Sequence, residues 1–253
     1  MLDDGIENCG VLYFGESSNV SFHPDDKDKS FISQMIDKEL PNEIVCDISK
    51  PAAHAEVYYE LLRNLDFDKN HVETVIMTVN LRSFGMNWIE SKLETSLQKE
   101  LVLLKEKPAL WKRFCLSFKL YDNKTERQRS DLQDIYFNQL YLTKPFDKTQ
   151  VSFRDWESEL DQSSDPRLAK VFLKVYGFEL NEETNPRIKD FDNIVKLCQE
   201  RNIRLIFNIL PENTEKASSL VGENLVELMK SNAKKITKRY RNQNISVVNN
   251  LEL

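Results

Sequence analysis

The sequence predicts a three-layer α/β/α fold: a doubly wound parallel sheet of five strands in the order 2-1-3-4-5, with a large helical insertion between the third and fourth strands. Two observations predict it. Five short runs are almost continuously apolar, which is typical of strands covered on both faces, and helical patterns fill the gaps between them. Alternating strands and helices form right-handed βαβ units. We expect a single domain over residues 1–253.

The elements follow one another in a regular order. The strands are expected at residues 9–14 (CGVLYF), 43–48 (EIVCDI), 73–79 (ETVIMTV), 203–210 (IRLIFNIL) and 244–249 (NISVVN). The helices are expected at residues 28–40, 51–64, 86–106, 185–201 and 215–240. The five strands therefore give the order 2-1-3-4-5 when every crossover is right-handed.

Residues 86–180 interrupt this alternation, and we interpret them as a helical insertion that forms a subdomain or lid. The segment is rich in aromatic residues: Trp88, Trp111, Phe114, Phe118, Tyr121, Tyr136, Tyr141, Trp156, Phe172 and Tyr176. Two interpretations of these residues stay open: they pack the insertion onto itself, or they line a hydrophobic groove for an acyl chain or a sugar. Loop signals concentrate in residues 122–134 and 143–165.

Composition excludes several classes of protein. The chain has 253 residues and a net charge of −6, which argues against a general nucleic-acid binder. No apolar run is long enough to span a bilayer. The 6 glycines of the chain form neither of the glycine-rich phosphate-binding motifs, GxGxxG and GxxxxGK[ST]. The 3 histidines and 4 cysteines form neither HExxH nor CxxC, so we expect no metal site and no cofactor.

The cysteines and the N-terminus carry little further signal. Cys9, Cys46 and Cys198 lie in or beside apolar stretches, and we expect each to pack as a free, small hydrophobic residue rather than in a disulfide. The first ten residues, MLDDGIENCG, lack the basic and apolar regions of an export signal.

Two late features have structural explanations. Residues 230–241 contain six cations at the end of a long amphipathic helix, where they complement the helix dipole and face solvent. The turn LPEN after the fourth strand resembles a strand-to-helix turn, and it places Glu212 and Asn213 on the carboxyl edge of the sheet.

The loops after the first and third strands are the expected site. In an open doubly wound sheet, ligands bind beyond the carboxyl ends of the strands where the strand order reverses, here between strands 1 and 3. The first loop reads GESSN from Gly15, and the third reads TVNLRS from Thr78. Ser17 is a candidate nucleophile, and the amide of Asn80 is a candidate donor to an oxyanion.

These two loops resemble the GDS and GxND blocks of the SGNH (GDSL) hydrolases. The resemblance implies that Ser17 is the nucleophile and Asn80 the side-chain oxyanion donor. It also implies a backbone donor after the second strand, where Ala52 or Ala53 replaces the family's glycine. Glu16, Asn19 and Arg82 are then expected to contact substrate, Arg82 through a carboxylate or phosphate unless it forms an ordinary ion pair. The pattern DISKPAAHAEVYY followed by NLRSFG also resembles SGNH-like proteins of bacterial surfaces.

The sequence departs from the family's pattern at several positions. Glu16 replaces the aspartate of the first block, and Thr78 and Leu81 replace the outer residues of the third. The family's Asp-x-x-His block, which supplies the base, follows the fifth strand, but this sequence has no histidine after His71. Either the sequence is a truncated fragment or the protein lacks the usual base.

Other histidines of the sequence are candidates for the base. His54 follows the second strand at the same edge and is the substitute base, unless it caps or packs the following helix. We expect His23 to be exposed.

The expected function is therefore that of a serine esterase or acyltransferase acting on an ester or O-acyl substrate, including carbohydrate esters. Two alternatives remain: a binding or scaffold protein that keeps the fold without catalysis, and a flavodoxin-like flavin or phosphate binder. The resemblance also allows a bacterial envelope or secreted location.

Overall fold

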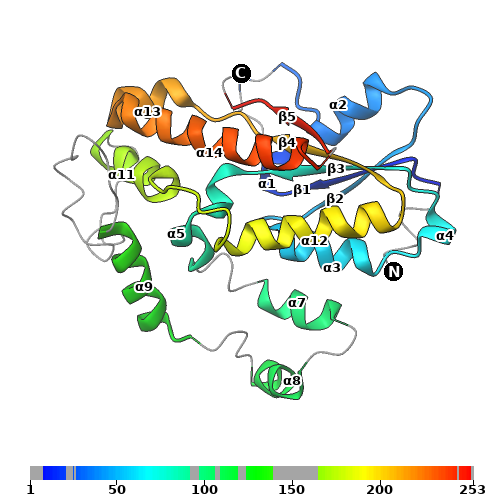
Figure 1. Ribbon diagram of the computed structural model, residues 1–253, viewed down its shortest axis with the longest axis horizontal. Coiled ribbons are helices and arrows are strands. Elements are labelled where there is room, and N and C mark those ends of the chain that lie inside the picture. Colours follow the sequence, from blue (N-terminus) through cyan, green and yellow to red (C-terminus); the bar gives the residue numbers. More distant parts are fainter. Residues whose placement is uncertain are drawn as a thin grey trace.

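The computed structural model describes residues 8–20, 25, 27–91, 97–105, 109–118, 124–138, 165–243 and 245–251 (Figure 1). Its centre is an all-parallel sheet in the order β2-β1-β3-β4-β5, which confirms the predicted topology. The strands are β1 (Val11–Gly15), β2 (Val45–Ser49), β3 (Thr74–Val79), β4 (Arg204–Ile209) and β5 (Ser246–Asn249). Val11 lies opposite Val45 on one side and Thr74 on the other, so β1 is central and all five of its residues are buried.

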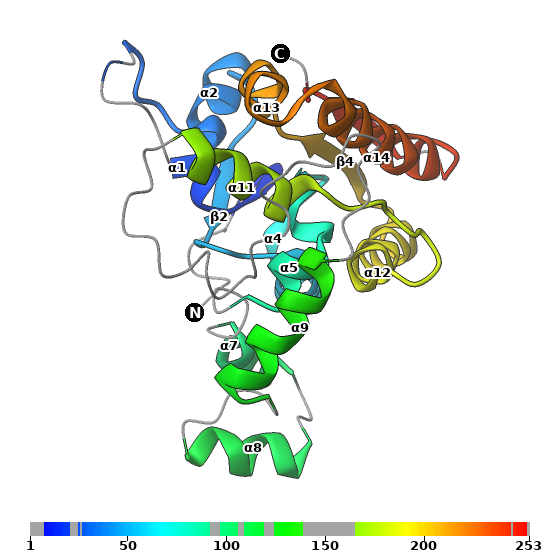
Figure 2. The ribbon, with the colours of Figure 1, turned by 90° about the vertical axis from the view of Figure 1, so that its left-hand side faces the viewer.

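The direction of each crossover decides which face its helix covers. The steps from β2 to β3, from β3 to β4 and from β4 to β5 all run the same way across the sheet, so right-handed connections bring their helices to one face. The step from β1 to β2 runs the opposite way and brings its helix to the other face, as Figures 1 and 2 show. The helices outside the insertion are α1 (Ser17–Val20), α2 (Ile32–Glu39), α3 (Ala55–Arg63), α4 (Phe67–Asn70), α12 (Pro186–Glu200), α13 (Thr214–Val221) and α14 (Glu223–Arg241).

Aromatic rings join the helices to the sheet. Phe191 of α12 packs edge-on against Phe207 of β4, with 5.1 Å between ring centroids, and Phe207 packs against Tyr240 of α14 at 4.9 Å. All three rings are buried. The bidentate ion pair of Arg239 with Asp192 also links α14 to α12. Gly222, at φ 117°, separates α13 from α14, which splits the single helix expected over residues 215–240.

Helices fill the described part of the insertion, as predicted. They are the 3-10 helix η2 (Leu81–Phe84), α5 (Met86–Ile89), α7 (Gln98–Leu104), α8 (Leu110–Ser117), α9 (Glu126–Asn138) and α11 (Asp165–Tyr176). The helix expected over residues 86–106 is thus present as α5 and α7. No helix in the described ranges is long and apolar enough to cross a membrane.

The loop expected over residues 122–134 is wrong from Glu126 onward, because α9 forms there. Thr125 Oγ1 accepts from the Gln128 N–H at 3.2 Å, and Gln128 Oε1 accepts from the Thr125 N–H at 2.8 Å. This is a capping box, a start signal visible in the sequence. Lys124 and Arg129 both pair with Glu90, the residue that follows α5, and these ion pairs fasten α9 to the domain.

The aromatic residues of the insertion do not behave as one group. Phe172 and Tyr176 of α11 pack with the domain, as the self-packing interpretation expects. Trp111, Phe114 and Phe118 are exposed instead, so for these three that interpretation is wrong. The side chains of Tyr121, Tyr136, Tyr141 and Trp156, and the expected loop 143–165 up to residue 164, lie outside the described residues.

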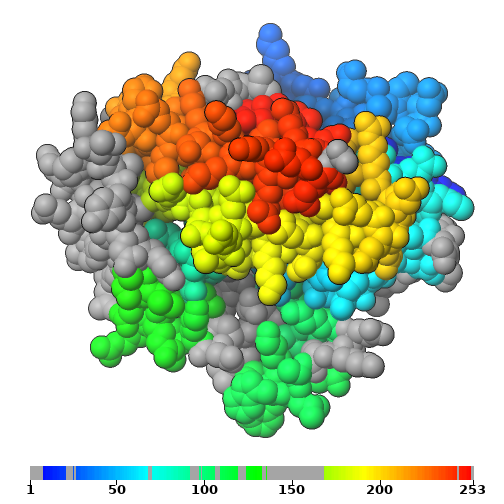
Figure 3. Space-filling view, viewed as in Figure 1, coloured from blue at the N-terminus to red at the C-terminus, as the bar shows by residue number. Residues whose placement is uncertain are grey.

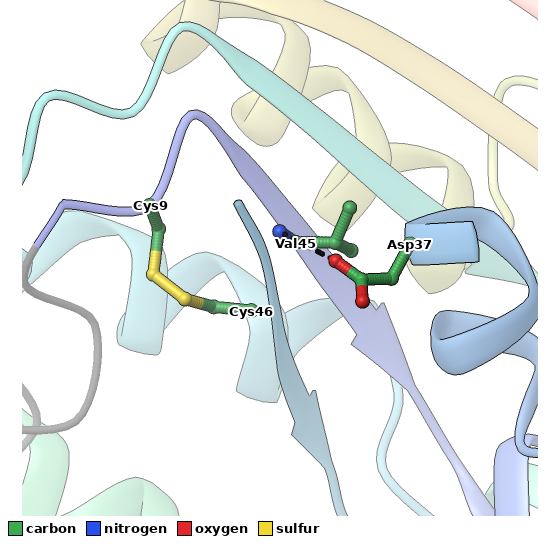
Figure 4. The surroundings of a disulfide bond; sticks show 4 residues. All are labelled: Cys9, Asp37, Val45 and Cys46. Atoms are coloured by element: carbon green, nitrogen blue, oxygen red, sulfur yellow. Dashed lines mark hydrogen bonds between the residues drawn. A yellow bond between two sulfur atoms is a disulfide. The ribbon is translucent and has the colours of Figure 1, made fainter. Parts of the chain in front are cut away.

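A disulfide joins Cys9 to Cys46 (Figure 4), so the expectation of free thiols at these positions is wrong. The two residues are 37 positions apart in sequence, with 5.8 Å between their Cα atoms. They meet because β1 and β2 are neighbours whose first residues lie side by side. Cys198 is free and buried as expected, and burial raises the pKa of its thiol to about 12.

Reducing the Cys9–Cys46 disulfide is expected to lower the free energy of unfolding by about 3–4 kcal/mol, because the unfolded chain regains the entropy of a closed loop. Urea unfolding with and without a phosphine reductant measures this. The Cys9→Ala/Cys46→Ala variant is the control and should not respond to the reductant. An equal response of the variant would contradict the assignment.

Candidate functional site

The candidate site lies at the carboxyl edge of the sheet, where the loops after β1 and β3 meet. β1 and β3 are hydrogen-bonded neighbours, so the loops that follow them come together as predicted, and this brings Glu16 after β1 to Asn80 after β3. The side-chain amide of Asn80 donates to Glu16 Oε1. Gly15, just before Glu16, lets β2 and α1 lie close to the end of β1, since a Cβ there would collide with Ser49 and Asn19.

Glu16 is the centre of this cluster. Its carboxylate is only 4% exposed, and the same oxygen that accepts from Asn80 also accepts from Arg82 Nη2 at 3.1 Å. Ser18 Oγ lies 3.5 Å away from it. A buried carboxylate needs such partners because burial penalises its charge. Glu16 therefore acts inside the protein, holding its neighbours, and the contact with substrate expected of it stays a prediction.

The sequence allowed two roles for Arg82, a substrate contact or an ordinary ion pair within the protein. The structure contains the ion pair. The guanidinium of Arg82 reaches Glu16 on one side and lies 4.7 Å from the centre of the Trp88 ring on the other. Its backbone N–H donates to Asn80 Oδ1 at 3.2 Å, so Asn80 caps η2. Asn80 thus bridges its own loop and Glu16, and its second amide hydrogen is the one that an oxyanion would use.

Ser17 begins α1, directly after Glu16, and is half-buried. Its position at the switch point between β1 and β3 is the one predicted for it. The chemistry expected of its hydroxyl stays a prediction.

Asn19 has a structural role, and the substrate contact expected of it stays a prediction. The residue is 1% exposed. Its Nδ2 lies 3.1 Å from Ser33 Oγ, 3.0 Å from Asp47 Oδ1 and 2.7 Å from Ser49 Oγ, and its Oδ1 accepts from the Ser33 N–H at 2.9 Å. These bonds join α1, α2 and β2 beneath the site and saturate the Asn19 amide.

Ala52 and Ala53, the two candidate backbone donors in the loop after β2, differ in the structure. The Ala53 N–H donates to the Lys50 carbonyl at 3.0 Å, so that group is already used inside a turn. Ala52 has a φ of 60°, a left-handed conformation that glycine adopts freely and alanine rarely does. Ala52 therefore stands in a conformation that a glycine would adopt without strain.

His54 is engaged elsewhere. The residue is 3% exposed, and its Nδ1 lies 2.8 Å from Nη1 of the buried Arg187 on α12. Because a guanidinium only donates, Nδ1 must accept, and the ring proton is on Nε2. The basic nitrogen of His54 is thus used in a bond to Arg187, and the expectation that His54 serves as the base stays a prediction. His23 lies outside the described residues.

Two residues extend the cluster toward β4. Glu212 follows β4 at the carboxyl edge, as predicted, and Tyr176 at the end of α11 hydrogen-bonds its carboxyl group. Burial raises the pKa of Glu212, while the hydrogen bond from Tyr176 and the charge of Arg82 oppose that rise. The bond between Tyr176 and Glu212 could not be predicted, because 35 residues and a whole helix separate the two in the chain.

The described residues contain no group of three His, Cys, Asp or Glu side chains placed to hold a metal ion. Comparison of the chain with protein-family models, with curated proteins and with solved structures gave no match.

Substitution of Asn19 by alanine is expected to lower the free energy of unfolding by about 2–3 kcal/mol, because the buried Ser33, Asp47 and Ser49 lose their shared partner. Chemical denaturation measures the loss. Asn242→Ala, at an exposed position after α14, is the control and should change little. Equal stabilities would show that Asn19 is not a structural link.

Glu212→Gln is expected to gain stability relative to the wild type as the pH rises. Burial raises the pKa of Glu212 in the folded protein above its ordinary value of about 4.5. The stability that the neutral carboxyl contributes is therefore fully present below pH 4.5 and is lost as the pH rises through the folded pKa. The uncharged glutamine has no such loss. Unfolding curves from acidic to neutral pH test this, and a pH-independent difference would contradict it.

Proposed function

We propose that this chain is an SGNH-hydrolase-like serine esterase or acyltransferase that acts on an ester or O-acyl substrate, including carbohydrate esters. One observation carries the proposal: Ser17 and Asn80 leave neighbouring parallel strands at the switch point of the sheet, and Glu16 ties the two loops together. A serine beside an oriented amide suits acyl transfer, which needs a nucleophile and a donor to the developing oxyanion.

The reaction follows from that placement. Ser17 Oγ attacks the acyl carbon of the substrate, and the carbonyl oxygen of the substrate becomes an oxyanion. The Ser17 N–H, the second amide hydrogen of Asn80 and the Ala52 N–H are the proposed donors. Collapse of this intermediate expels the alcohol, which takes up the proton that the base removed from Ser17, and leaves an acyl-serine. Water (in an esterase) or a second hydroxyl (in an acyltransferase) then attacks the acyl-serine and releases the acid or the new ester, and the proton returns to Ser17 Oγ.

Glu16 and Arg82 are proposed to position the donors. Glu16 fixes the Asn80 amide in one orientation, and Arg82 offsets the carboxylate's negative charge, which would otherwise oppose a nearby oxyanion. The same buried carboxylate disfavours a phosphate at this loop, so the arrangement fits a neutral ester better than the flavin or phosphate of the flavodoxin-like alternative.

The mechanism also needs a base that accepts the proton of the Ser17 hydroxyl. His54 Nδ1 accepts a hydrogen bond from Arg187 Nη1, so the proposal assigns the base to a histidine of the Asp-x-x-His type implied by the resemblance. The same observation favours a second candidate, a protein that binds an ester or sugar at this edge without turning it over.

The disulfide bears on location. Disulfides persist in oxidising compartments and are rare in reducing ones, so Cys9–Cys46 favours the bacterial envelope or secreted location that the resemblance allows.

Ser17→Ala is expected to lower hydrolysis of p-nitrophenyl acetate by about a hundredfold or more, because it removes the nucleophile. The assay is run with and without added imidazole, which supplies a base in solution. Imidazole should accelerate the wild type above the rate of Ser17→Ala under the same conditions.

Ser231→Ala, at an exposed position of α14, is the matched control and should behave as the wild type. If wild type and Ser17→Ala hydrolyse the ester equally, with and without imidazole, Ser17 is not a nucleophile. Binding of acylated sugars without turnover would then assign the site to the second candidate.

A further inference from the structure

Helix α8 carries a row of exposed aromatic side chains. Trp111, Phe114 and Phe118 follow one another at helical spacing and are 62%, 54% and 63% exposed. Their rings contact each other along the row, with 5.5 Å between the centroids of Trp111 and Phe114 and 5.0 Å between those of Phe114 and Phe118. Leu110 beside them is 82% exposed. A contiguous apolar surface of this kind marks an interaction site.

α8 lies at one end of the molecule. In Figures 1 and 2, two views at right angles, it is the helix farthest below the sheet, and the space-filling view shows it projecting there (Figure 3). Cys115 is the buried residue of this helix. Each ring of the aromatic row is nevertheless more than half exposed, so a large flat partner can reach the row at this end of the molecule.

The charge around α8 is opposite to that of the whole chain. Lys112 and Arg113 are exposed beside the aromatic row, and residues 105–119 contain five cations and one acid, whereas the chain has a net charge of −6. Helix α8 itself contains no acidic residue. The partner of this surface is thus expected to be both apolar and anionic.

We propose that α8 attaches the protein to an anionic lipid bilayer, with Trp111, Phe114 and Phe118 inserted at the boundary between headgroups and acyl chains and Lys112 and Arg113 against lipid phosphates. Tryptophan and phenylalanine flanked by lysine and arginine are the side chains of helices that lie in the membrane interface. A soluble anion would account for the cations but leave the aromatic row without an apolar partner.

A second copy of the chain fits this surface less well than a bilayer. In a two-fold symmetric dimer the same patch faces itself, so Lys112 and Arg113 of one copy would approach those of the other. The repulsion between these cations opposes such a pairing, whereas phosphate headgroups neutralise them.

Co-sedimentation with vesicles tests the proposal. The wild type should bind vesicles of phosphatidylcholine mixed with phosphatidylglycerol, bind vesicles of phosphatidylcholine alone far less, and be released by salt. Trp111→Ser/Phe114→Ser should lower the bound fraction about tenfold or more. Lys112→Gln/Arg113→Gln should weaken binding to the anionic vesicles and reduce its salt dependence.

A matched control and a second readout keep the test specific. Ile44→Ser removes an apolar side chain of similar exposure, 56%, at the start of β2, and should leave binding unchanged. Tryptophan emission should shift to shorter wavelength on binding, and Trp111→Phe should abolish most of that shift while vesicle binding persists. Circular dichroism confirms that each variant is folded.

Two results would overturn the proposal. One is a folded wild type that binds neither kind of vesicle, or whose binding the aromatic double substitution leaves unchanged. The other is a concentration-dependent dimer that the same substitution disperses, which would assign the surface to a second copy of the chain.

Discussion

The buried carboxylate of Glu16 is the group on which the candidate site depends. It lies between the ends of the two central strands, and it accepts from Asn80 and from Arg82 through the same oxygen. An ionised carboxylate that is 4% exposed is stable only with such partners. The requirement therefore fixes the positions of three side chains, and with them the loop in which Ser17 lies. The positive charge of Arg82 is held in turn by Trp88, so the network reaches from the sheet into the insertion.

A second polar link supports this arrangement from below. Asn19 ties α1 to Ser33 of α2 and to Asp47 and Ser49 of β2, so the short helix that begins with Ser17 is anchored to two further elements. A site on a rigid edge of a sheet keeps its donors oriented before a substrate arrives, which is the condition for stabilising a transition state. The bonds of Glu16 and Asn19 thus provide the rigid positioning that the proposed acyl transfer needs.

The sheet, the order of its strands and the meeting of the loops after β1 and β3 could be predicted from the sequence, because continuous apolar runs and right-handed crossovers leave one topology. Residues far apart in the chain could not. The Cys9–Cys46 disulfide and the Tyr176–Glu212 bond depend on contacts between elements that no local pattern encodes. The structural bonds of Asn19 are equally hidden, because a loop asparagine looks the same in sequence whether it faces a ligand or the core. The capping box at Thr125 was visible and was outweighed by the polar composition around it.

The central claim, that Glu16 organises this edge by binding Asn80, is tested most directly by a double-mutant cycle. The free energies of unfolding of the wild type, Glu16→Gln, Asn80→Ala and the double variant give the coupling between the two side chains. A coupling of about 1.5 kcal/mol or more is expected for a buried hydrogen bond to a charged group. Additive effects of the two substitutions would contradict the account.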